Sequence, residues 1–419
     1  MKRRLFPHQQ EAVEFIQQRR FTLLADEMGL GKTLSALATT SPKEKTLVIA
    51  PKSLLYNWKN EIYQTHHIPN VQIVEAKIPP KIQYNGYILI NYDILDRYID
   101  SLIQWQPDTI IVDESHYIKN IKTRRTKMVL ELANHTTARI ICLTGTPLLS
   151  RVADLFPYFV LAGKLSPKDY LKYLNFFSHK EQKIIHHRAI TQYTGIKNKD
   201  KLIAWLKEFT LRRKKKDIID LPDMLETIHF LSHYKDYPED ISLKDIVKSV
   251  ALASHVSHVR HTTALKKAND PLLYDLIDDM MEQTEKLVIF AHHKDVILTL
   301  ADKLKQYNPQ IILGSDSADN RNYAIKKFQE DPNTHILIIS ILAGGVGLNI
   351  TNTSYAIFVE MDWTYGIMEQ AKARLHRIGQ KNTTHFYYVV YESSIDHLVA
   401  KAIVEKEQLT ITLNEGIEA

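Results

Sequence analysis

Two blocks of short apolar runs set the strongest limit on how this chain of 419 residues can fold. The first block contains FTLLAD from residue 21, TLVIAP from 46, YILINYD from 87, TIIVDESH from 109 and RIICLTGTP from 139. The second block contains KLVIFAHH from 286, QIILG from 310, HILIIS from 335, YAIFVEM from 355 and HFYYVVY from 385. Each run has the length of a buried strand, is too short to span a bilayer, and is followed by a stretch with helical spacing. This alternation predicts the α/β class, with a parallel sheet in each block.

The segment between the two blocks lacks such runs. DYLKYLNFF at 169–177 and DKLIAWLKEF at 200–209 place apolar residues at helical spacing, which predicts helices there. IDHLVAKAIVEKEQL at 395–409 has the same spacing and predicts a closing helix. We therefore expect an N-terminal lobe at 1–160, a helical insertion or linker at 161–265, a C-terminal lobe at 266–395, and a helix at 396–419 that packs back on the lobes.

Composition and the N-terminal sequence exclude several classes of protein. Cys142 is the only cysteine, which excludes an internal disulfide and any multi-cysteine metal site. The start, MKRRLFPHQQ, has no apolar region after its basic residues, so it is not a secretory signal. The net charge of +6 favours a polyanionic partner but does not identify one. We expect an intracellular protein without a membrane partner, in the cytoplasm of a bacterium or of a phage- or virus-infected cell, or in a eukaryotic nucleus.

A phosphate-binding loop is predicted where the first apolar run ends, in DEMGLGKT at 26–33. Gly29 and Gly31 let the backbone turn tightly, Lys32 would meet the β- and γ-phosphates, and the Thr33 hydroxyl would ligate Mg²⁺. The general pattern has a glycine where Asp26 stands, so this loop matches a narrower helicase-type variant. The phosphates would lie at the N-terminus of the following helix.

Two carboxylates at the end of IIVDESH, residues 110–116, supply the partner that a phosphate loop needs. Asp113 would hold Mg²⁺ through water, and Glu114 would activate the attacking water. An isolated Asp-Glu pair is more often a polar strand end, but here it follows a phosphate loop in chain order. The sequence therefore predicts a site for ATP and Mg²⁺.

Joined by LTGTP at 143–147, these motifs resemble the superfamily 2 helicase-type ATPases, and specifically their Swi/Snf-like branch. In the first half, LFPHQ at 5–9 is similar to the Q motif and APKSLLYNW at 50–58 to motif Ia. In the second half, LVIFAHHKDV at 287–296 resembles motif IV, SILAGGVGLNIT at 340–351 motif V, and QAKARLHRIGQ at 370–380 motif VI. Motif IV, with VRHTTALKKA at 259–268 before it, looks most like the annealing-helicase (HARP-like) branch.

This resemblance implies two tandem RecA-like lobes of the P-loop NTPase type and assigns roles to individual residues. The residues implied in catalysis are Lys32, Asp113, Glu114, Arg374 and Arg377, with the arginines acting as fingers from the second lobe. Those implied in ATP binding are Gln9, Met28, Gly29, Leu30, Gly31, Lys32 and Thr33, and the metal would be held by Thr33 and Asp113. Residues implied in coupling nucleotide state to nucleic-acid grip are Thr144, Gly145, Thr146, Gly347, Gln370 and Gln380.

DNA contacts are also implied by position in motifs Ia and V. The candidates are Lys52, Ser53, Trp58, Ser340, Gly344 and Gly345. For Lys52 and Trp58 a solvated lysine and a core tryptophan are equally good interpretations. RRKKK at 212–216 is either a phosphate-binding patch or a soluble face, and the family context favours binding.

The resemblance predicts an ATP-dependent translocase on double-stranded DNA, either duplex or forked, that remodels protein–DNA or branched DNA structures. Two alternatives stay open: a strand-separating helicase, and a DNA-binding scaffold that does not hydrolyse ATP. The motor uses nearly all of the chain, so we expect protein partners to supply targeting.

Overall fold

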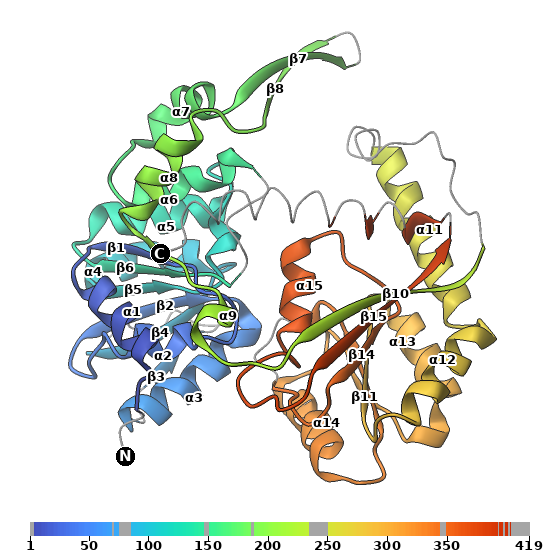
Figure 1. Ribbon diagram of the computed structural model, residues 1–419. Helices are drawn as coiled ribbons and strands as arrows, with labels where there is room; N and C mark the ends of the chain where they lie inside the picture. The colour runs from blue at the N-terminus through green and yellow to red at the C-terminus, as the bar shows by residue number, and fades with distance from the viewer. Residues whose placement is uncertain are drawn as a thin grey trace. The chain divides into compact units, whose positions relative to one another are not determined.

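The computed structural model divides into two compact units, one comprising Met1–Ile218 and the other beginning at Ile219. It describes residues 4–68, 71–74, 85–145, 151–185, 188–233, 250–343, 349–392, 394–396, 399–400 and 403. Figure 1 shows a sheet flanked by helices in each unit. The predicted α/β class with two parallel sheets is confirmed.

The first unit is built on a parallel sheet with the order β3-β4-β2-β5-β6-β1-β9. Its strands are β1 (Phe21–Leu24), β2 (Lys45–Ala50), β3 (Val71–Ile73), β4 (Gly86–Asn91), β5 (Thr109–Val112), β6 (Arg139–Leu143) and β9 (Thr210–Leu211). Its helices are α1 (Pro7–Gln17), α2 (Lys32–Leu37), α3 (Leu55–His66), α4 (Leu95–Trp105), α5 (Arg124–His135), α6 (Phe156–Leu161), α7 (Tyr170–Phe177), α8 (Lys199–Lys207) and α9 (Lys215–Ile218). Short 3₁₀ turns lie at η1 (Lys52–Leu54), η2 (Ser115–Ile118), η3 (Val152–Leu155) and η4 (Pro167–Asp169).

Alternate residues of the central strands fill two cores, one on each face of this sheet. Leu47 and Ile49 of β2 pack with α4 and α5 on one face, whereas Val48 packs with α1, α2 and α3 on the other. Because both faces are covered, the central strands are apolar throughout, which is why the sequence shows them as continuous runs. The carboxyl ends of the parallel strands then meet at one edge of the sheet.

The second unit has the parallel strand order β10-β15-β14-β11-β13-β12. Its strands are β10 (Met224–His233), β11 (Leu287–Ala291), β12 (Gln310–Ile312), β13 (Ile336–Ser340), β14 (Tyr355–Phe358) and β15 (Thr384–Glu392). Its helices are α11 (Val250–Lys267), α12 (Pro271–Met281), α13 (Lys294–Lys303), α14 (Ala318–Glu330) and α15 (Tyr365–Lys372), with a 3₁₀ turn at η5 (Lys305–Tyr307). Helices α12 and α13 pack on one face of the sheet, and α14 and α15 on the other.

The expected helical insertion at 161–265 is not helical throughout. It contains helices α7, α8, α9 and most of α11. However, β9 joins the first sheet, β10 joins the second, and β7 (His179–Ile185) pairs antiparallel with β8 (Arg188–Thr194). Figure 1 shows this hairpin extending away from α7. These strands were not predicted because β9 has only two residues, and because β7, β8 and β10 carry polar residues and lie at the edges of their sheets. Most of the expected C-terminal helix at 396–419 lies outside the described residues.

Candidate active site

The predicted phosphate loop joins β1 to α2, and two of its positions require glycine. Gly29 and Gly31 have φ values of 91° and 78°, in the left-handed region that side chains other than glycine rarely adopt. A Cβ atom on Gly31 would also lie 2.2 Å from Nε2 of Gln9. The loop is therefore shaped by its glycines, as the sequence predicts.

Helix α1 holds this loop from the side. Gln9 is buried, accepts a hydrogen bond from the Phe6 amide at 3.0 Å, and donates one to the Leu30 carbonyl at 3.4 Å. His8 contacts the same carbonyl through Nε2 at 2.9 Å. The structure thus brings Gln9 to the phosphate loop, and its contact with adenine stays a prediction.

Lys32, the first residue of α2, folds back over the loop backbone. Its Nζ donates to the carbonyl oxygens of Asp26 at 2.6 Å and Glu27 at 3.2 Å. Burial lowers the pKa of Lys32, although the carboxylates of Asp26, Glu114 and Asp113 act in the opposite direction. Lys32 and the predicted carboxylate pair therefore lie in one electrostatic neighbourhood. Thr33 follows in the first turn of α2, half-buried.

Asp113 follows the last residue of β5 and is held from three sides. The Trp58 indole donates to Oδ2 at 2.7 Å, the Glu114 amide donates to Oδ1 at 2.9 Å, and the Tyr92 hydroxyl donates to the Asp113 carbonyl at 2.5 Å. Burial, reinforced by the Glu114 carboxylate, raises the pKa of Asp113 to about 6. A nearby cation stabilises the ionised form of a carboxylate whose pKa is raised in this way. Asp113 is therefore suited to hold a metal ion.

Glu114 has a backbone conformation that is unusual for its residue type. Its φ of 47° lies in the left-handed region, and its Oε2 lies 3.2 Å from Nδ1 of His116. Such strain costs of order 1–3 kcal/mol and persists where the surrounding structure enforces it, most often at functional sites. This conformation lies directly after Asp113, where the chain leaves β5 and enters the 3₁₀ turn η2.

LTGTP reaches the same loop because β6 lies beside β1. The Thr144 amide donates to the Leu24 carbonyl at 3.2 Å. A Cβ atom on Gly145 would lie 2.3 Å from Cγ of Met28 and 3.1 Å from Nζ of Lys32, so Gly145 permits a close approach to the phosphate loop. Thr146 lies outside the described residues.

The motif VI residues belong to the second unit, at and after α15. Gln380 donates to the Thr353 carbonyl at 2.8 Å and accepts from the amides of Lys381 and Asn382 at 3.0 and 3.1 Å. His376 contacts the Pro222 carbonyl through Nε2 at 2.9 Å. These contacts fix the shape of the loop that follows α15.

The other described residues of motif VI differ in how far they are buried. Gln370 is buried, Arg374 and Arg377 are half-buried, and burial lowers the pKa of Arg377. Gly347 lies outside the described residues. The catalytic role of the two arginines and the coupling roles of Gln370 and Gln380 stay predictions.

Comparison with known proteins identifies the family. The family model described as SNF2-related domain matches residues 8–267, and the helicase conserved C-terminal domain matches residues 269–379. The chain belongs to the SNF2-related family. The predicted Swi/Snf-like resemblance is therefore confirmed.

Relatives of this SNF2 chain are larger proteins. The DNA annealing helicase and endonuclease ZRANB3 of Homo sapiens is 27% identical over 446 residues, covering 99% of this chain and 41% of that protein. The SWI/SNF-related matrix-associated actin-dependent regulator of chromatin subfamily A-like protein 1 of Xenopus laevis is 29% identical over 431 residues, covering 96% and 43%. A Sulfolobus solfataricus SWI2/SNF2 ATPase core in complex with dsDNA is 25% identical, with 100% and 97% covered and a TM-score of 0.47. The chain thus spans about two fifths of the length of the two relatives.

The predicted DNA contacts of this SNF2 chain fall into three groups. Lys52 and Ser53 are exposed in η1 and are available to a ligand. Trp58, in α3, is 2% exposed, donates to Asp113 and packs in the core, which favours the core interpretation; its DNA contact stays a prediction. Ser340, at the end of β13, is 5% exposed, which argues against direct contact in this conformation. Gly344 and Gly345 lie outside the described residues.

The structure divides the basic run at 212–216: its two arginines are buried, whereas Lys216 is exposed. Arg212 and Arg213 are buried against the first sheet, where they contact Ala25 and Asp26. They are neither a phosphate-binding patch nor a soluble face. The signal that would have found them is the carboxylate of Asp26 in place of the usual glycine, because a buried carboxylate needs a partner.

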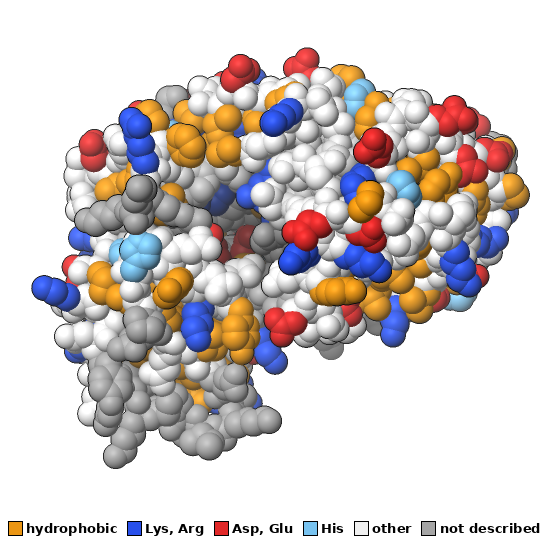
Figure 2. Space-filling model, turned by 90° about the horizontal axis from the view of Figure 1, so that it is seen from below, with side chains coloured by type: hydrophobic (Ala, Val, Ile, Leu, Met, Phe, Trp, Pro, Cys, Tyr) orange, Lys and Arg blue, Asp and Glu red, His pale blue; other side chains and the backbone are white. Residues whose placement is uncertain are grey.

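The face of the molecule seen in Figure 2 carries charges of both signs. On the face seen in Figure 2, Lys and Arg side chains are interspersed with Asp and Glu side chains. In the described part of the chain, no group of three or more His, Cys, Asp and Glu residues is arranged to hold a metal ion. Among the described helices, none is both long and apolar enough to cross a membrane.

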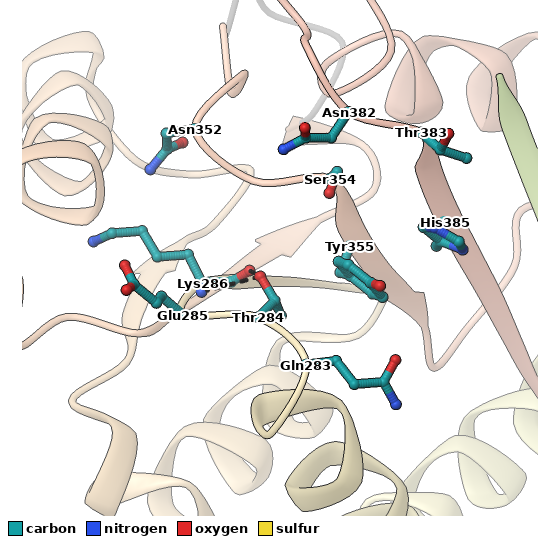
Figure 3. Close-up of a pocket in the computed structure, with 10 residues that line it drawn as sticks. All are labelled: Gln283, Thr284, Glu285, Lys286, Asn352, Ser354, Tyr355, Asn382, Thr383 and His385. Atoms are coloured by element: carbon teal, nitrogen blue, oxygen red, sulfur yellow. Dashed lines mark hydrogen bonds between the residues drawn. The ribbon is translucent and has the colours of Figure 1, made fainter. Parts of the chain in front are cut away.

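A pocket of about 460 Å³ lies in the second unit, at the amino ends of β11, β14 and β15 (Figure 3). Tyr355 and His385 stack there with ring centroids 4.7 Å apart, and Figure 3 shows them side by side on neighbouring strands. Its lining is Gln283, Thr284, Glu285, Lys286, Asn352, Ser354, Tyr355, Asn382, Thr383 and His385. None of these is a predicted site residue, because the motifs follow the carboxyl ends of the strands.

Proposed function

We propose that this chain is a DNA-dependent ATPase that uses ATP and Mg²⁺ to translocate on duplex DNA. The observation that carries this proposal is the convergence of Lys32, Asp113 and Glu114 beside a glycine-shaped loop at the carboxyl edge of the first sheet. β1, β6 and β5 lie side by side and parallel, so the loop after β1 and the carboxylates after β5 leave the same edge of the sheet. Membership in the SNF2-related family and a relative named as a DNA annealing helicase support the DNA part.

Each residue has a distinct role in this proposal. Lys32 gives up its hydrogen bonds to the carbonyls of Asp26 and Glu27 and binds the β- and γ-phosphates, whose negative charge it neutralises. Thr33 and Asp113 would hold Mg²⁺, which would supply positive charge that stabilises the negative charge of the transition state. Glu114 positions and activates the attacking water. The burial that raises the pKa of Asp113 strengthens every one of these electrostatic interactions.

Arg374 and Arg377 complete the chemistry in this proposal. Guanidinium groups stay charged and match phosphoryl oxygens, so they stabilise the charge that develops during hydrolysis. The contacts of Gln380 and His376 fix the loop that carries them. Thr144 and Gly145 would report the state of the nucleotide, because Gly145 lies against Met28 and Lys32.

DNA would be held mainly through its phosphates, because a motor that steps along a duplex cannot depend on base sequence. Lys52 and Ser53 are the candidates that the structure leaves exposed. Forked DNA and protein partners that supply targeting remain part of the proposal.

The test is the ATPase rate of the protein without nucleic acid and with single-stranded DNA, blunt duplex, forked DNA and RNA. The expected result is the strongest stimulation by blunt duplex, with activity lost in Lys32→Ala and Glu114→Gln. Robust strand displacement on a fork would instead establish a strand-separating helicase. Tight DNA binding without ATP turnover would establish a scaffold, and stimulation by RNA alone would overturn the DNA assignment.

A further inference from the structure

The segment that leads out of the first unit runs along the phosphate loop before it ends. β9 pairs with β1, and the hydrogen bonds continue beyond β1 into the loop. The Leu23 amide donates to the Phe209 carbonyl at 2.8 Å, the Ala25 amide to Leu211 at 2.8 Å, and the Glu27 amide to Arg213 at 3.1 Å. We call residues 209–215 the exit segment, since the second unit begins at Ile219.

Arg213 adds a side-chain clamp to this backbone ladder. Its Nε and Nη2 donate to the two carboxylate oxygens of Asp26 at 3.1 and 2.5 Å, a bidentate pair in which the side chains are 7% and 2% exposed. Its Nη1 donates to the His8 carbonyl at 2.5 Å and to Oε2 of Glu11 at 3.1 Å. One guanidinium therefore joins the exit segment, the phosphate loop and helix α1.

Neighbouring contacts reinforce the same junction. Arg212 donates from Nη1 to the Ala25 carbonyl at 2.9 Å, and the Lys215 amide donates to Oε2 of Glu27 at 2.9 Å. Both acidic residues that open the loop, Asp26 and Glu27, are thus held by the exit segment. This explains why a carboxylate stands at 26, where the general phosphate-loop pattern has glycine.

A buried ion pair of this kind contributes geometry more than net stability. Desolvation of the two charges offsets much of their attraction, whereas the forked shape of arginine fixes the orientation of the carboxylate. Here Arg213 fixes the orientation of Asp26, and the carbonyl oxygen of Asp26 accepts a hydrogen bond from Lys32 Nζ at 2.6 Å. The position of the phosphate-binding lysine therefore depends on Arg213.

We propose that Arg213 is a positioning residue for nucleotide binding, which holds the phosphate loop and the Gln9-bearing helix in register with the exit segment. The proposal rests on the proposed use of ATP. It predicts that the affinity for ATP depends on a residue that does not itself touch the nucleotide. The competing interpretation of 212–216, as a basic patch for DNA, predicts an effect on DNA affinity instead.

The experiment measures the Kd of the full chain for a fluorescent ATP analogue, the KM and kcat for ATP, and the Kd for a duplex at several salt concentrations. The variants are Arg213→Lys, which keeps the charge but loses the fork, and Arg213→Ala. Lys216→Ala is the matched control, because Lys216 is an exposed residue of α9 and its substitution removes one positive charge from the same basic run. Thermal unfolding verifies that each variant is folded.

Arg213→Lys and Arg213→Ala are expected to weaken ATP-analogue binding and raise the KM about tenfold, since charged hydrogen bonds are lost. The duplex Kd and its salt dependence are expected to stay unchanged, and Lys216→Ala should leave ATP binding as in the wild type. If Arg213→Ala does not fold, Arg213→Lys and Asp26→Asn decide.

Two results would overturn the proposal. One is an unchanged Kd for the ATP analogue in folded Arg213→Lys and Asp26→Asn. The other is weaker duplex binding with a salt slope smaller by about 0.9, which is the loss of one phosphate contact. A wild type that binds the analogue without hydrolysing ATP would contradict the proposed function alone, because binding still tests Arg213.

Discussion

Two buried carboxylates at corresponding places in the two units behave in opposite ways. Asp113 directly follows β5 in the first unit, and Glu360 lies two residues beyond β14 in the second. Burial and Glu114 raise the pKa of Asp113 to about 6. Burial also acts to raise the pKa of Glu360, but the hydrogen bonds and charge of His293, with the amide of His292, lower it to about 2.

The difference lies in what each carboxylate receives. Glu360 accepts hydrogen bonds at Oε2 from the amides of His292 and His293 at 2.7 and 2.9 Å, and its Oε1 lies 2.7 Å from Nδ1 of His293. Asp113 shares its surroundings with a second carboxylate. Glu360 is compensated by its donors and acts as an anchor, whereas the pKa of Asp113 stays raised although Trp58 and the Glu114 amide donate to it, so an added cation would stabilise it further. A buried acid at a strand end is thus a functional candidate when the protein undercompensates it.

The sharpest test of this comparison is Asp113→Asn. We expect the ATPase rate to fall by about 10²–10³-fold, the loss typical of removing a group that stabilises transition-state charge. The free energy of unfolding of the first unit should stay the same or rise, because an undercompensated buried charge disappears. Steady-state kinetics and hydrogen exchange measure the two quantities. A clear loss of stability would show that Asp113 is an anchor like Glu360.

Glu360→Gln should show the converse pattern. Breaking a buried, hydrogen-bonded carboxylate site is expected to lower the free energy of unfolding of the second unit by roughly 3 kcal/mol. Unit-resolved hydrogen exchange measures this. Glu330→Gln is the control, because Glu330 and its partner Lys326 are both exposed, and such pairs contribute about 0–1 kcal/mol. Equal losses in both variants would remove the distinction.

The pH dependence of stability should have opposite signs in the two units. Asp113 ionises near 3.8 when unfolded and near 6 when folded, so its contribution to stability falls as pH rises between these values. Glu360 ionises near 4.5 when unfolded and near 2 when folded, so its contribution is present above 4.5 and lost as pH falls towards 2. Each slope is at most about 1.4 kcal/mol per pH unit.

Urea unfolding of each unit, followed by hydrogen exchange from pH 3 to 7, separates these slopes. Asp113→Asn should remove the falling slope of the first unit, and Glu360→Gln the rising slope of the second. Identical profiles for the wild type and both variants would mean that neither carboxylate is shifted.

The smallest effect is expected for Trp58→Phe, which keeps the apolar bulk and removes the indole N–H that donates to Asp113. One hydrogen bond to a charged group contributes about 1.5 kcal/mol or less after the ring has adjusted, so the Mg²⁺ concentration for half-maximal ATPase should rise roughly 3–10-fold. Trp205→Phe, in an aromatic cluster with Phe159 and Phe177, is the matched control. An unchanged Mg²⁺ requirement would reduce Trp58 to a packing role.

The central strands were predictable because both faces of a parallel sheet are buried, which makes their sequence apolar throughout. β10 was not, because it lies at an edge: Leu225, Ile228 and Phe230 are exposed, while Glu226 pairs with Lys372, the last residue of α15, at 2.6 Å. Its pattern places apolar residues outside, contrary to the usual rule.

Within the site, residues defined by local chemistry were predicted and residues defined by distant partners were not. The glycines of the phosphate loop and the carboxylates after β5 follow from what a phosphate and a metal require. The partners Trp58–Asp113 and Arg213–Asp26 lie 55 and 187 residues apart in the chain, and nothing local in the sequence signals such a pairing. The sequence left Trp58 open between a DNA contact and a core residue, and the basic run open between a phosphate-binding patch and a soluble face.

The position of β9 at the edge of the first sheet also constrains how this protein is made. During synthesis β1 emerges early, but Leu23 pairs with Thr210, after nearly all of the first unit has been translated. Until Arg213 has been translated, the Asp26 carboxylate lacks its guanidinium partner, and the phosphate loop lacks one of its supports. A nascent chain released or cleaved before Arg213 would carry the whole phosphate loop at 26–33 and still lack the side chain that holds Asp26. If Arg213 positions the phosphate loop as proposed, full affinity for nucleotide is reached only when the ribosome has translated the connection to the second unit.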